Sequence, residues 1–338
     1  MNPPLLKIEN LKKYFVIKNG NSFVAANNKK VVKAIDDVSL EIFQGETLGL
    51  VGESGCGKST LGKNILRLQE PTEGQVFFKD KDILKYNNRE LRRLRKEMQI
   101  IYQDPFGSLN PRFTIGEIIG EMYEIHKTDR EIDKLSEIKK MLELVGLDSE
   151  KYNSYPHELS GGQRQRVGIA RALALNPDFV VADEPVSALD VSVQSQIINL
   201  LMDLKKDLGL TMLFIAHGLN VVRHISDRVG VMYLGRIVEI SETDNIFDTP
   251  AHPYTAALLS TVPDVDVSLR KERIVLKGEV PSPANPPSGC HFRTRCPLAT
   301  EKCQLEVPKM QEVRNGHYVS CHFPLGADQS LKDVVSNL

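Results

Sequence analysis

The residues with the clearest chemical potential are those of GESGCGKST, from Gly52 to Thr60, which have the spacing of a phosphate-binding loop. Glycines at 52, 55 and 57 allow the backbone to curl so that successive N–H groups point at phosphate oxygens. We expect Lys58 to reach the β- and γ-phosphates and Ser59 to give its hydroxyl to Mg²⁺. Thr60 would bind an inner phosphate through its hydroxyl or N–H group. The predicted nucleotide ligands are therefore Gly52, Glu53, Ser54, Gly55, Cys56, Gly57, Lys58, Ser59 and Thr60.

A second set of reactive side chains is the acid pair Asp183-Glu184, which follows the apolar run FVVA. Two carboxylates then stand where a buried strand meets the surface. We expect Asp183 to hold the Mg²⁺ shell and Glu184 to polarise the attacking water, because phosphoryl transfer needs positioning and charge neutralisation more than covalent chemistry. Asp-Glu-Pro is by itself common in solvated turns, and the phosphate loop favours the catalytic interpretation.

Each of these two motifs follows a predicted buried strand. The run TLGLVG, 47–52, predicts a strand buried on both faces, and a helix is expected from Lys58. After residue 163 the pattern alternates between helix and strand, which predicts a parallel α/β core. The other predicted elements are the helices QRQRVGIARALAL and VQSQIINLLMDLKKDLG and the strands FVVAD and TMLFIAH.

Two further regions have other patterns. Short alternating segments near the N-terminus, at 31–42 and from Gly74, predict an antiparallel sheet, and the polar stretch 18–30 is expected to be a loop within it. Apolar residues at three and four spacing, as in IDKLSEIKKMLELVGL, predict a helical lobe over about 105–165. A proline-rich segment, 278–289, marks a linker into a cysteine-containing tail.

Composition and charge narrow the class of protein. The chain has 338 residues, 41% hydrophobic and 26% charged, which is enough to bury a full core in two or three lobes. Its 43 basic and 44 acidic residues give a net charge of -1, so nucleic acid gains no support as a partner. No apolar run approaches the roughly 18–20 residues that cross a bilayer. We expect a chain of the reducing cytoplasm, whose membrane contact comes through a partner.

The segment LSGGQRQRVGIARAL, 159–173, separates this chain from the many phosphate-binding enzymes that share the first two motifs. It resembles the signature of ABC ATPases, in which a Ser-Gly-Gly turn opens a helix whose exposed N–H groups bind the γ-phosphate held by the opposite subunit. The resemblance assigns this role to Ser160, Gly161, Gly162 and Gln163. A capped amphipathic helix is the alternative, although it does not explain a glycine pair at a helix start.

Other positions of this family also match, and together they cover most of residues 8–240. The resemblance implies that Gln103 senses the γ-phosphate and Mg²⁺ and that His217 contacts the γ-phosphate. It also implies that the loop from Ser187 to Asp190 communicates across a dimer. The aromatic residue that stacks on adenine is expected at Phe15, with Tyr14 as the alternative. Gly218 departs from the family, which often has an acidic or amide residue there.

Beyond residue 240 the chain resembles the C-terminal extension of peptide-transporter ATPases. The matching segments are AHPYTAALLSTVP, 251–263, and GEVPSPANPPSGCHFRTRCPLATEKC, 278–303. The phrases GETLGLVGESGCGKSTLG and YQDPFGSLNPR look closer to the F-type member of the paired ATPases than to its D-type sister. Nickel importers share much of this pattern and remain an alternative.

The cysteines of the tail form a candidate metal site. Cys290, Cys296, Cys303 and Cys321 are the four that lie outside the phosphate loop, and four thiols in a reducing compartment suggest a metal. Their spacing allows a [4Fe-4S] cluster or zinc, and the resemblance favours the cluster. Free thiols packed in a small lobe are the alternative. His291, His317 and His322 are available as zinc ligands but are expected on the surface.

The complete prediction is an α/β P-loop ABC ATPase with a RecA-like parallel core, an antiparallel β subdomain and a helical subdomain. The ATPase domain would span 1–250 and the cysteine-containing extension 251–338. The resemblance implies ATP and Mg²⁺ as cofactors, with Glu184, His217, Gln103 and Lys58 as catalytic residues. It implies peptide import at the cytoplasmic face of the membrane, with a second copy or a sister ATPase, two permease subunits and, indirectly, an external peptide-binding protein. A soluble ABC protein of DNA repair or translation and a metal-sensing protein are the alternatives from other classes.

Overall fold

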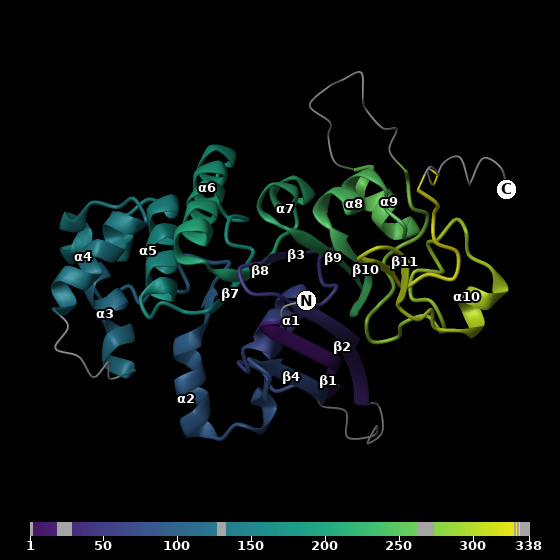
Figure 1. Ribbon diagram of the computed structural model, residues 1–338, viewed down its shortest axis with the longest axis horizontal. Helices are drawn as coiled ribbons and strands as arrows, with labels where there is room; N and C mark the ends of the chain where they lie inside the picture. Colours follow the sequence, from purple (N-terminus) through teal and green to yellow (C-terminus); the bar gives the residue numbers. More distant parts are fainter. Residues whose placement is uncertain are drawn as a thin grey trace. The chain divides into compact units, whose positions relative to one another are not determined.

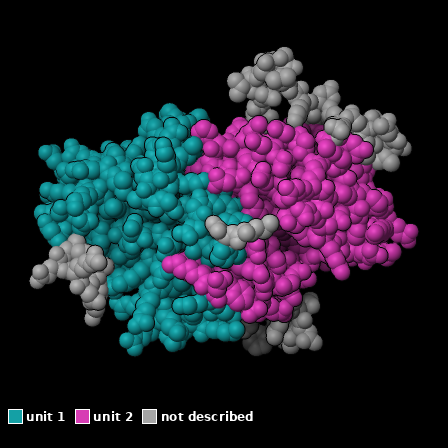
Figure 2. Space-filling model, in the orientation of Figure 1, with its two compact units in different colours: residues 1–5, 42–47, 81–216 teal, residues 6–41, 48–80, 217–338 magenta. Residues whose placement is uncertain are grey.

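The computed structural model describes residues 3–18, 29–126, 133–261, 274–327, 329 and 331. These residues form two compact units, coloured separately in Figure 2. Unit 1 contains residues 1–5, 42–47 and 81–216, and unit 2 contains 6–41, 48–80 and 217–338. Most of the stretch 18–30, which was expected to be a loop, lies outside the described residues.

Unit 1 contains three parallel strands and the longest helices of the described chain (Figure 1). The strands pair in the order β6-β7-β8, and every residue of β7 and β8 is buried. This agrees with the continuous apolar runs in their sequences, because a parallel strand is covered on both faces. The elements are β5 (Lys81–Asp82), η1 (Ile83–Lys85), α2 (Asn88–Glu97), β6 (Met98–Ile101), α3 (Ile115–Ile125), α4 (Lys134–Leu144), η2 (Ser149–Asn153), η3 (Pro156–Glu158), α5 (Gly161–Leu173), β7 (Phe179–Asp183), α6 (Val191–Leu208) and β8 (Thr211–Ile215).

The expected helical region contains α3 and α4, and both of them contact α5. Local sequence explains where α3 begins, because Thr114 and Glu117 form a capping box across its first turn. On α4 the buried residues include Ile138 and Leu142, four positions apart, as expected for one apolar helix face. The boundaries of a helical subdomain at about 105–165 stay a prediction.

Unit 2 contains the predicted antiparallel strands and a second sheet. The first sheet has the order β2-β1-β4, with β1 and β4 antiparallel. In the second sheet β3 pairs with β9 in parallel, and antiparallel pairs continue through β10 and β12 to β11. The elements are β1 (Leu6–Lys18), β2 (Lys29–Ile42), β3 (Thr47–Val51, whose first residue belongs to unit 1), α1 (Lys58–Ile65), β4 (Glu73–Phe78), α7 (Leu219–Ile225), β9 (Arg228–Tyr233), β10 (Arg236–Glu242), α8 (Thr243–Asp248), α9 (Pro253–Leu259), α10 (Glu301–Leu305), β11 (Gln311–Arg314) and β12 (His317–Val319).

The tail is built into this second sheet, which the sequence patterns did not predict. Strand β12 pairs with β10, so residues near 318 extend the sheet that contains β3, β9 and β10. A buried carboxylate, Glu239 of β10, also joins β10 to the segments that follow it. It accepts hydrogen bonds from the backbone N–H groups of Ala251 at 2.6 Å and His252 at 2.9 Å. Its Oε1 also lies 2.7 Å from Nε2 of His317. Glu239 therefore holds the segments around residues 251 and 317 against β10.

Among the described residues, no helix combines the length and the apolar character that a membrane crossing requires. The parallel strands, the antiparallel sheet and the helical region agree with the predicted α/β fold class.

Candidate nucleotide-binding site

The phosphate loop follows β3 in unit 2, and its three glycines have the positive φ angles that the motif predicts. Gly52, Gly55 and Gly57 have φ values of +153°, +76° and +110°. Two of them also lie against backbone: an added Cβ would be 2.1 Å from the carbonyl oxygen of Met232 at Gly52, and 2.1 Å from that of Ala34 at Gly57. A side chain at either position would require the loop to move.

Lys58 is the first residue of α1 and its side chain is buried in the loop. Its Nζ donates to the carbonyl oxygens of Gly52 at 2.8 Å and Glu53 at 3.2 Å. Ser59 and Thr60 lie in the first turn of the same helix, as the motif predicts. Cys56 is buried in the loop, and this burial raises the pKa of its thiol.

Two residues that sequence analysis missed contact Glu53 of this loop. Arg295 forms a bidentate ion pair with the Glu53 carboxylate, and the hydroxyl of Tyr254 accepts a hydrogen bond from the Glu53 backbone N–H group. The hydrogen bond from Arg295 to Glu53 raises the pKa of the guanidinium further above its usual value. These residues lie 242 and 201 positions from Glu53, so no local spacing could have identified them.

In unit 1 the structure brings Gln103 and Glu184 together. Asp183 is the last residue of β7, and both Asp183 and Glu184 are buried. Gln103 follows β6 by two residues and donates from Nε2 to Oε2 of Glu184 at 2.6 Å. Since β6 and β7 are parallel, their carboxyl ends meet at one edge of the sheet. The structure thus places these two predicted site residues side by side at the carboxyl ends of β6 and β7.

The backbone of Glu184 has an unusual conformation for this residue type. Its φ angle is +50°, in the left-handed region that residues with a Cβ rarely occupy. The conformation is held by hydrogen bonds of the Glu184 backbone: its N–H group donates to the carbonyl oxygen of Ile215 at 3.0 Å, and its carbonyl oxygen accepts from the Ser187 hydroxyl at 3.1 Å. Strained conformations of this kind are frequent at functional sites.

The signature segment begins a helix as predicted. Ser160 is the N-cap of α5, and it forms a capping box with Gln163: the Gln163 N–H group donates to Ser160 Oγ, and the Ser160 N–H group donates to Gln163 Oε1. Ser160 is exposed, so the first turn of α5 is accessible.

Gly162 has a packing role that sequence analysis did not foresee. A Cβ at this position would lie 2.5 Å from Cγ1 of Val193 on α6. At Gly161 the nearest atom to an added Cβ would be Cδ2 of Leu189, at an ordinary contact distance of 3.5 Å. Helix packing therefore explains one glycine of the pair, and the other remains available for a functional explanation.

The structure distinguishes the two aromatic residues considered for adenine stacking. Tyr14 donates its hydroxyl to the Asp36 carboxylate, whereas the side chain of Phe15 is 37% exposed. Burial alone would raise the pKa of Asp36, but the bonds from Tyr14 and Arg236 hold it below its usual value. Phe15 is thus the ring that is open to a ligand.

The remaining predicted residues lie at element ends. His217 is an exposed residue two positions after β8, and Gly218 is the N-cap of α7. Asp190 is the N-cap of α6, at the end of the loop that begins at Ser187.

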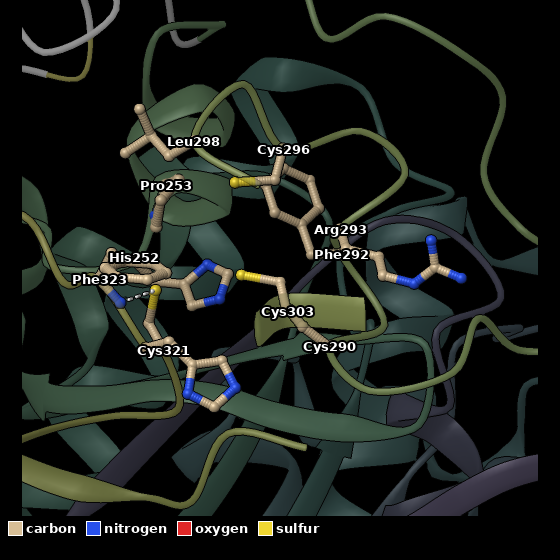
Figure 3. A pocket seen from close by; sticks show the side chains of 11 residues that line it. His252, Pro253, Cys290, Phe292, Arg293, Cys296, Leu298, Cys303, Cys321 and Phe323 are labelled. Atoms are coloured by element: carbon tan, nitrogen blue, oxygen red, sulfur yellow. Dashed lines mark hydrogen bonds between the residues drawn. The ribbon is translucent and has the colours of Figure 1, made fainter. Parts of the chain in front are cut away.

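The four tail cysteines line one pocket in unit 2, together with His252, Phe292 and His322 (Figure 3). Burial raises the pKa values of Cys296 and Cys321 to about 12. However, no group of three or more His, Cys, Asp or Glu side chains among the described residues is arranged to hold a metal ion. The predicted convergence of the cysteines is observed, and the predicted metal gains no support from this side-chain arrangement.

The expectation that three nearby histidines lie on the surface is wrong for two of them. His317 is fully buried beside Glu239, and His291 is buried with its Nδ1 3.2 Å from the carbonyl oxygen of Leu234. His322 is partly exposed and lines the cysteine pocket.

Comparisons with known proteins agree with this geometry. Residues 35–187 match the family described as ABC transporter, and residues 238–303 match the oligopeptide/dipeptide transporter C-terminal region. The chain is similar to a putative peptide import ATP-binding protein of Brucella ovis, with 53% identity over 94% of this chain and 97% of that protein. It is also similar to the oligopeptide transport ATP-binding protein AppF of Bacillus subtilis, with 52% identity over 94% of this chain and 97% of AppF.

A solved structure with the same fold is the dimeric ATP-binding cassette MJ0796 in a post-hydrolysis state bound to ADP and Pi. It has 29% sequence identity and a TM-score of 0.61, covering 70% of this chain and 98% of its own. The fold and the site thus define a P-loop ABC ATPase. More specifically, the chain belongs to the family of ATP-binding subunits of oligopeptide and dipeptide ABC transporters.

Proposed function

We propose that this chain hydrolyses ATP to power the import of oligopeptides or dipeptides, as the nucleotide-binding subunit of an ABC transporter. The observation that carries the proposal is the 2.6 Å hydrogen bond between Gln103 and the buried Glu184, in a chain that also has a phosphate loop and a capped signature helix. The names of the relatives and the match of the C-terminal region to oligopeptide/dipeptide transporters support peptide as the cargo.

Each site residue has a proposed role in this reaction. Lys58 binds the β- and γ-phosphates, Ser59 and Asp183 hold Mg²⁺ with Gln103, and Glu184 polarises the attacking water. The exposed Phe15 stacks on adenine, and His217 contacts the γ-phosphate. The loop amides bind phosphate oxygens, and Gly52, Glu53, Ser54, Gly55, Cys56, Gly57 and Thr60 provide them.

The signature segment completes a second copy's site in this proposal. Its accessible first turn, with Ser160 as N-cap and N–H groups at Gly161, Gly162 and Gln163, suits a γ-phosphate held by another subunit. The partner is a second copy or a sister ATPase, this chain being the F-type member, and two permease subunits hold both at the cytoplasmic face of the membrane. A peptide-binding protein outside the membrane delivers the cargo.

We also propose a division into an ATPase domain, 1–250, with a helical subdomain at about 105–165, and an extension, 251–338. The separate family matches at 35–187 and 238–303 support this division.

Transport assays test the peptide cargo. The chain would be expressed with its permease subunits, purified from membranes and reconstituted in vesicles that contain Lys58→Ala or wild-type protein. We expect ATP-dependent uptake of labelled peptides by the wild-type complex only. Uptake of nickel without peptide, or a chain that associates with no membrane subunit, would contradict the proposal.

A [4Fe-4S] cluster in the cysteine pocket, with zinc as the alternative, is the second part of the proposal. Its support is the convergence of Cys290, Cys296, Cys303 and Cys321 on one pocket. A bound cluster would crosslink four chain segments of the extension. Anaerobic purification and iron, sulfide and zinc analysis test it, with Cys296→Ser expected to lose the metal and Cys56→Ser to retain it. Neither iron nor zinc in wild-type protein would exclude the site.

A further inference from the structure

Glu53 of the phosphate loop is held by residues from outside the loop, and its N–H group, carbonyl oxygen and carboxylate all have hydrogen-bond partners. The Glu53 N–H group donates to Tyr254 Oη at 2.9 Å, and the Glu53 carbonyl oxygen accepts from Lys58 Nζ at 3.2 Å. The carboxylate accepts from Arg295, with Nη1 at 2.7 Å and Nη2 at 2.9 Å. Glu53 therefore connects the phosphate-binding lysine to two residues of the C-terminal extension.

The ion pair between Arg295 and Glu53 is well placed to restrict the loop. Only 9% of the Arg295 side chain and 26% of the Glu53 side chain are exposed, so water screens the pair weakly. Bidentate pairing of a guanidinium with a carboxylate also constrains orientation as well as distance. The exposed pair Arg223–Asp248 of this unit lacks these properties, with side-chain exposures of 53% and 63% and a contact of 3.4 Å.

Aromatic packing fixes the two residues that hold Glu53. Tyr254 is fully buried, and its ring centroid is 4.7 Å from that of Tyr233 and 5.4 Å from that of Phe292. Arg295 lies over Tyr233 with 5.9 Å between its guanidinium carbon and the ring centroid. Phe292 in turn lines the cysteine pocket, so the same packed cluster supports the pocket and the residues on the loop.

We propose that Arg295 and Tyr254 are positioning residues for the phosphate loop, through which the C-terminal extension pre-organises Glu53 and Lys58 for ATP. The proposal rests on the role of the loop in phosphate binding. A loop that is ordered before the nucleotide arrives loses less conformational entropy on binding, which strengthens ATP binding. Once bound phosphates hold the loop, the contacts of Arg295 and Tyr254 with Glu53 add little to the rate of the chemical step. The extension thus affects the affinity for ATP more than the rate of hydrolysis.

Kinetics and binding of the full chain test this role. Arg295→Gln removes the bidentate pair, and we expect it to raise both the Kd and the KM for Mg-ATP about tenfold while kcat changes less than about twofold. Arg295→Lys keeps one charged donor and should recover part of the affinity. Tyr254→Phe keeps the packed ring, removes only the acceptor of the Glu53 N–H group, and should raise Kd by about threefold.

A double-mutant cycle separates positioning from general damage. Glu53→Gln and Arg295→Gln should each weaken ATP binding, and the double variant should be no weaker than either single variant, because both changes break the same pair. Glu70→Gln is the matched control: it alters another bidentate Arg–Glu pair of this unit, formed with Arg67 at 2.8 Å to 3.2 Å, and should leave Kd unchanged.

The proposal is overturned if Arg295→Gln and Tyr254→Phe leave Kd within twofold of wild type. Multiplicative losses in the double variant, or an equal loss in Glu70→Gln, would also overturn it. Lys58→Ala distinguishes this failure from that of the proposed function. If Lys58→Ala abolishes ATP binding while the Arg295 variants bind normally, only the positioning role is wrong. If Lys58→Ala binds ATP like wild type, the phosphate-loop assignment itself is wrong.

Discussion

The phosphate loop and the cysteine pocket are sites of two different kinds. The loop is one continuous segment, and Lys58 is held by carbonyl groups only five and six positions away. The pocket is assembled from segments around residues 252, 290–298, 303 and 321–323. The curled backbone of the loop depends on its own glycines, with Arg295 and Tyr254 as distant partners of Glu53, whereas the pocket exists only if the extension folds. We therefore expect a change at Glu184, in a nucleotide motif, to affect hydrolysis, and a change at Glu239, which holds the segments that follow β10, to affect stability.

The largest expected effect is on the fold of the extension. Glu239→Ala removes the acceptor of two buried N–H groups and leaves His317 without its carboxylate, at a site with no solvent exposure. We expect the free energy of unfolding to fall by about 3–5 kcal/mol. Denaturant unfolding measures this loss. Glu242→Ala, an exposed position on the same strand, is the control and should change stability by less than about 0.5 kcal/mol. Equal losses of stability in the Glu239 and Glu242 variants would contradict the structural role of Glu239.

The second largest expected effect is a loss of ATP hydrolysis without a loss of stability, caused by a change at Glu184. Glu184→Gln keeps the shape of the side chain but removes the charge that we propose polarises water, so we expect kcat to fall by at least about 10²-fold. ATP affinity and thermal unfolding should stay near the wild-type values. Steady-state ATPase assays and nucleotide titration measure both quantities. Unchanged hydrolysis would refute Glu184 as the residue that activates water.

The smallest expected effects are those of glycine substitutions in the signature helix α5, where they separate a packing role from a functional role. Gly162→Ala places a Cβ against Val193, and we expect a loss of about 1–3 kcal/mol in stability. Gly168→Ala lies on the same helix, where an added Cβ meets no described atom within 4 Å outside the helix backbone. It should be neutral or stabilising by up to about 1 kcal/mol. Gly161→Ala should be tolerated structurally, so a loss of ATPase activity there would identify a functional glycine.

The cysteine pocket drawn in Figure 3 was predictable from the sequence only in part. Four cysteines in one tail were enough to predict that they lie together. Disulfides are rare in a reducing compartment, so clustered thiols there suggest a shared metal site. Their arrangement was not predictable, since it depends on how segments separated by up to 31 positions, from Cys290 to Cys321, are packed. The strands β11 and β12 were missed for a related reason: they are short, and their pairing with β10 gives little local pattern.

By itself, the sequence determined the features that depend on neighbouring residues. Glycine spacing predicted the curled backbone of the phosphate loop, and the Ser-Gly-Gly segment predicted the start of helix α5. Apolar runs predicted the buried strands β3, β7 and β8. In each case the physical cause is local, because backbone conformation, capping and burial pattern repeat over a few residues.

Only the tertiary structure decided which distant side chains meet. Nothing near Glu53 in the sequence indicates that Arg295 and Tyr254 hold it, and nothing near Glu239 indicates that His317 is its partner. Such contacts form because a buried charge is costly unless it has a hydrogen-bond or ion-pair partner. That partner can lie far away in the sequence, because the entropic cost of closing a loop grows only slowly with its length. For the same reason, the packing of Gly162 against Val193 could be recognised only once α5 and α6 were in place.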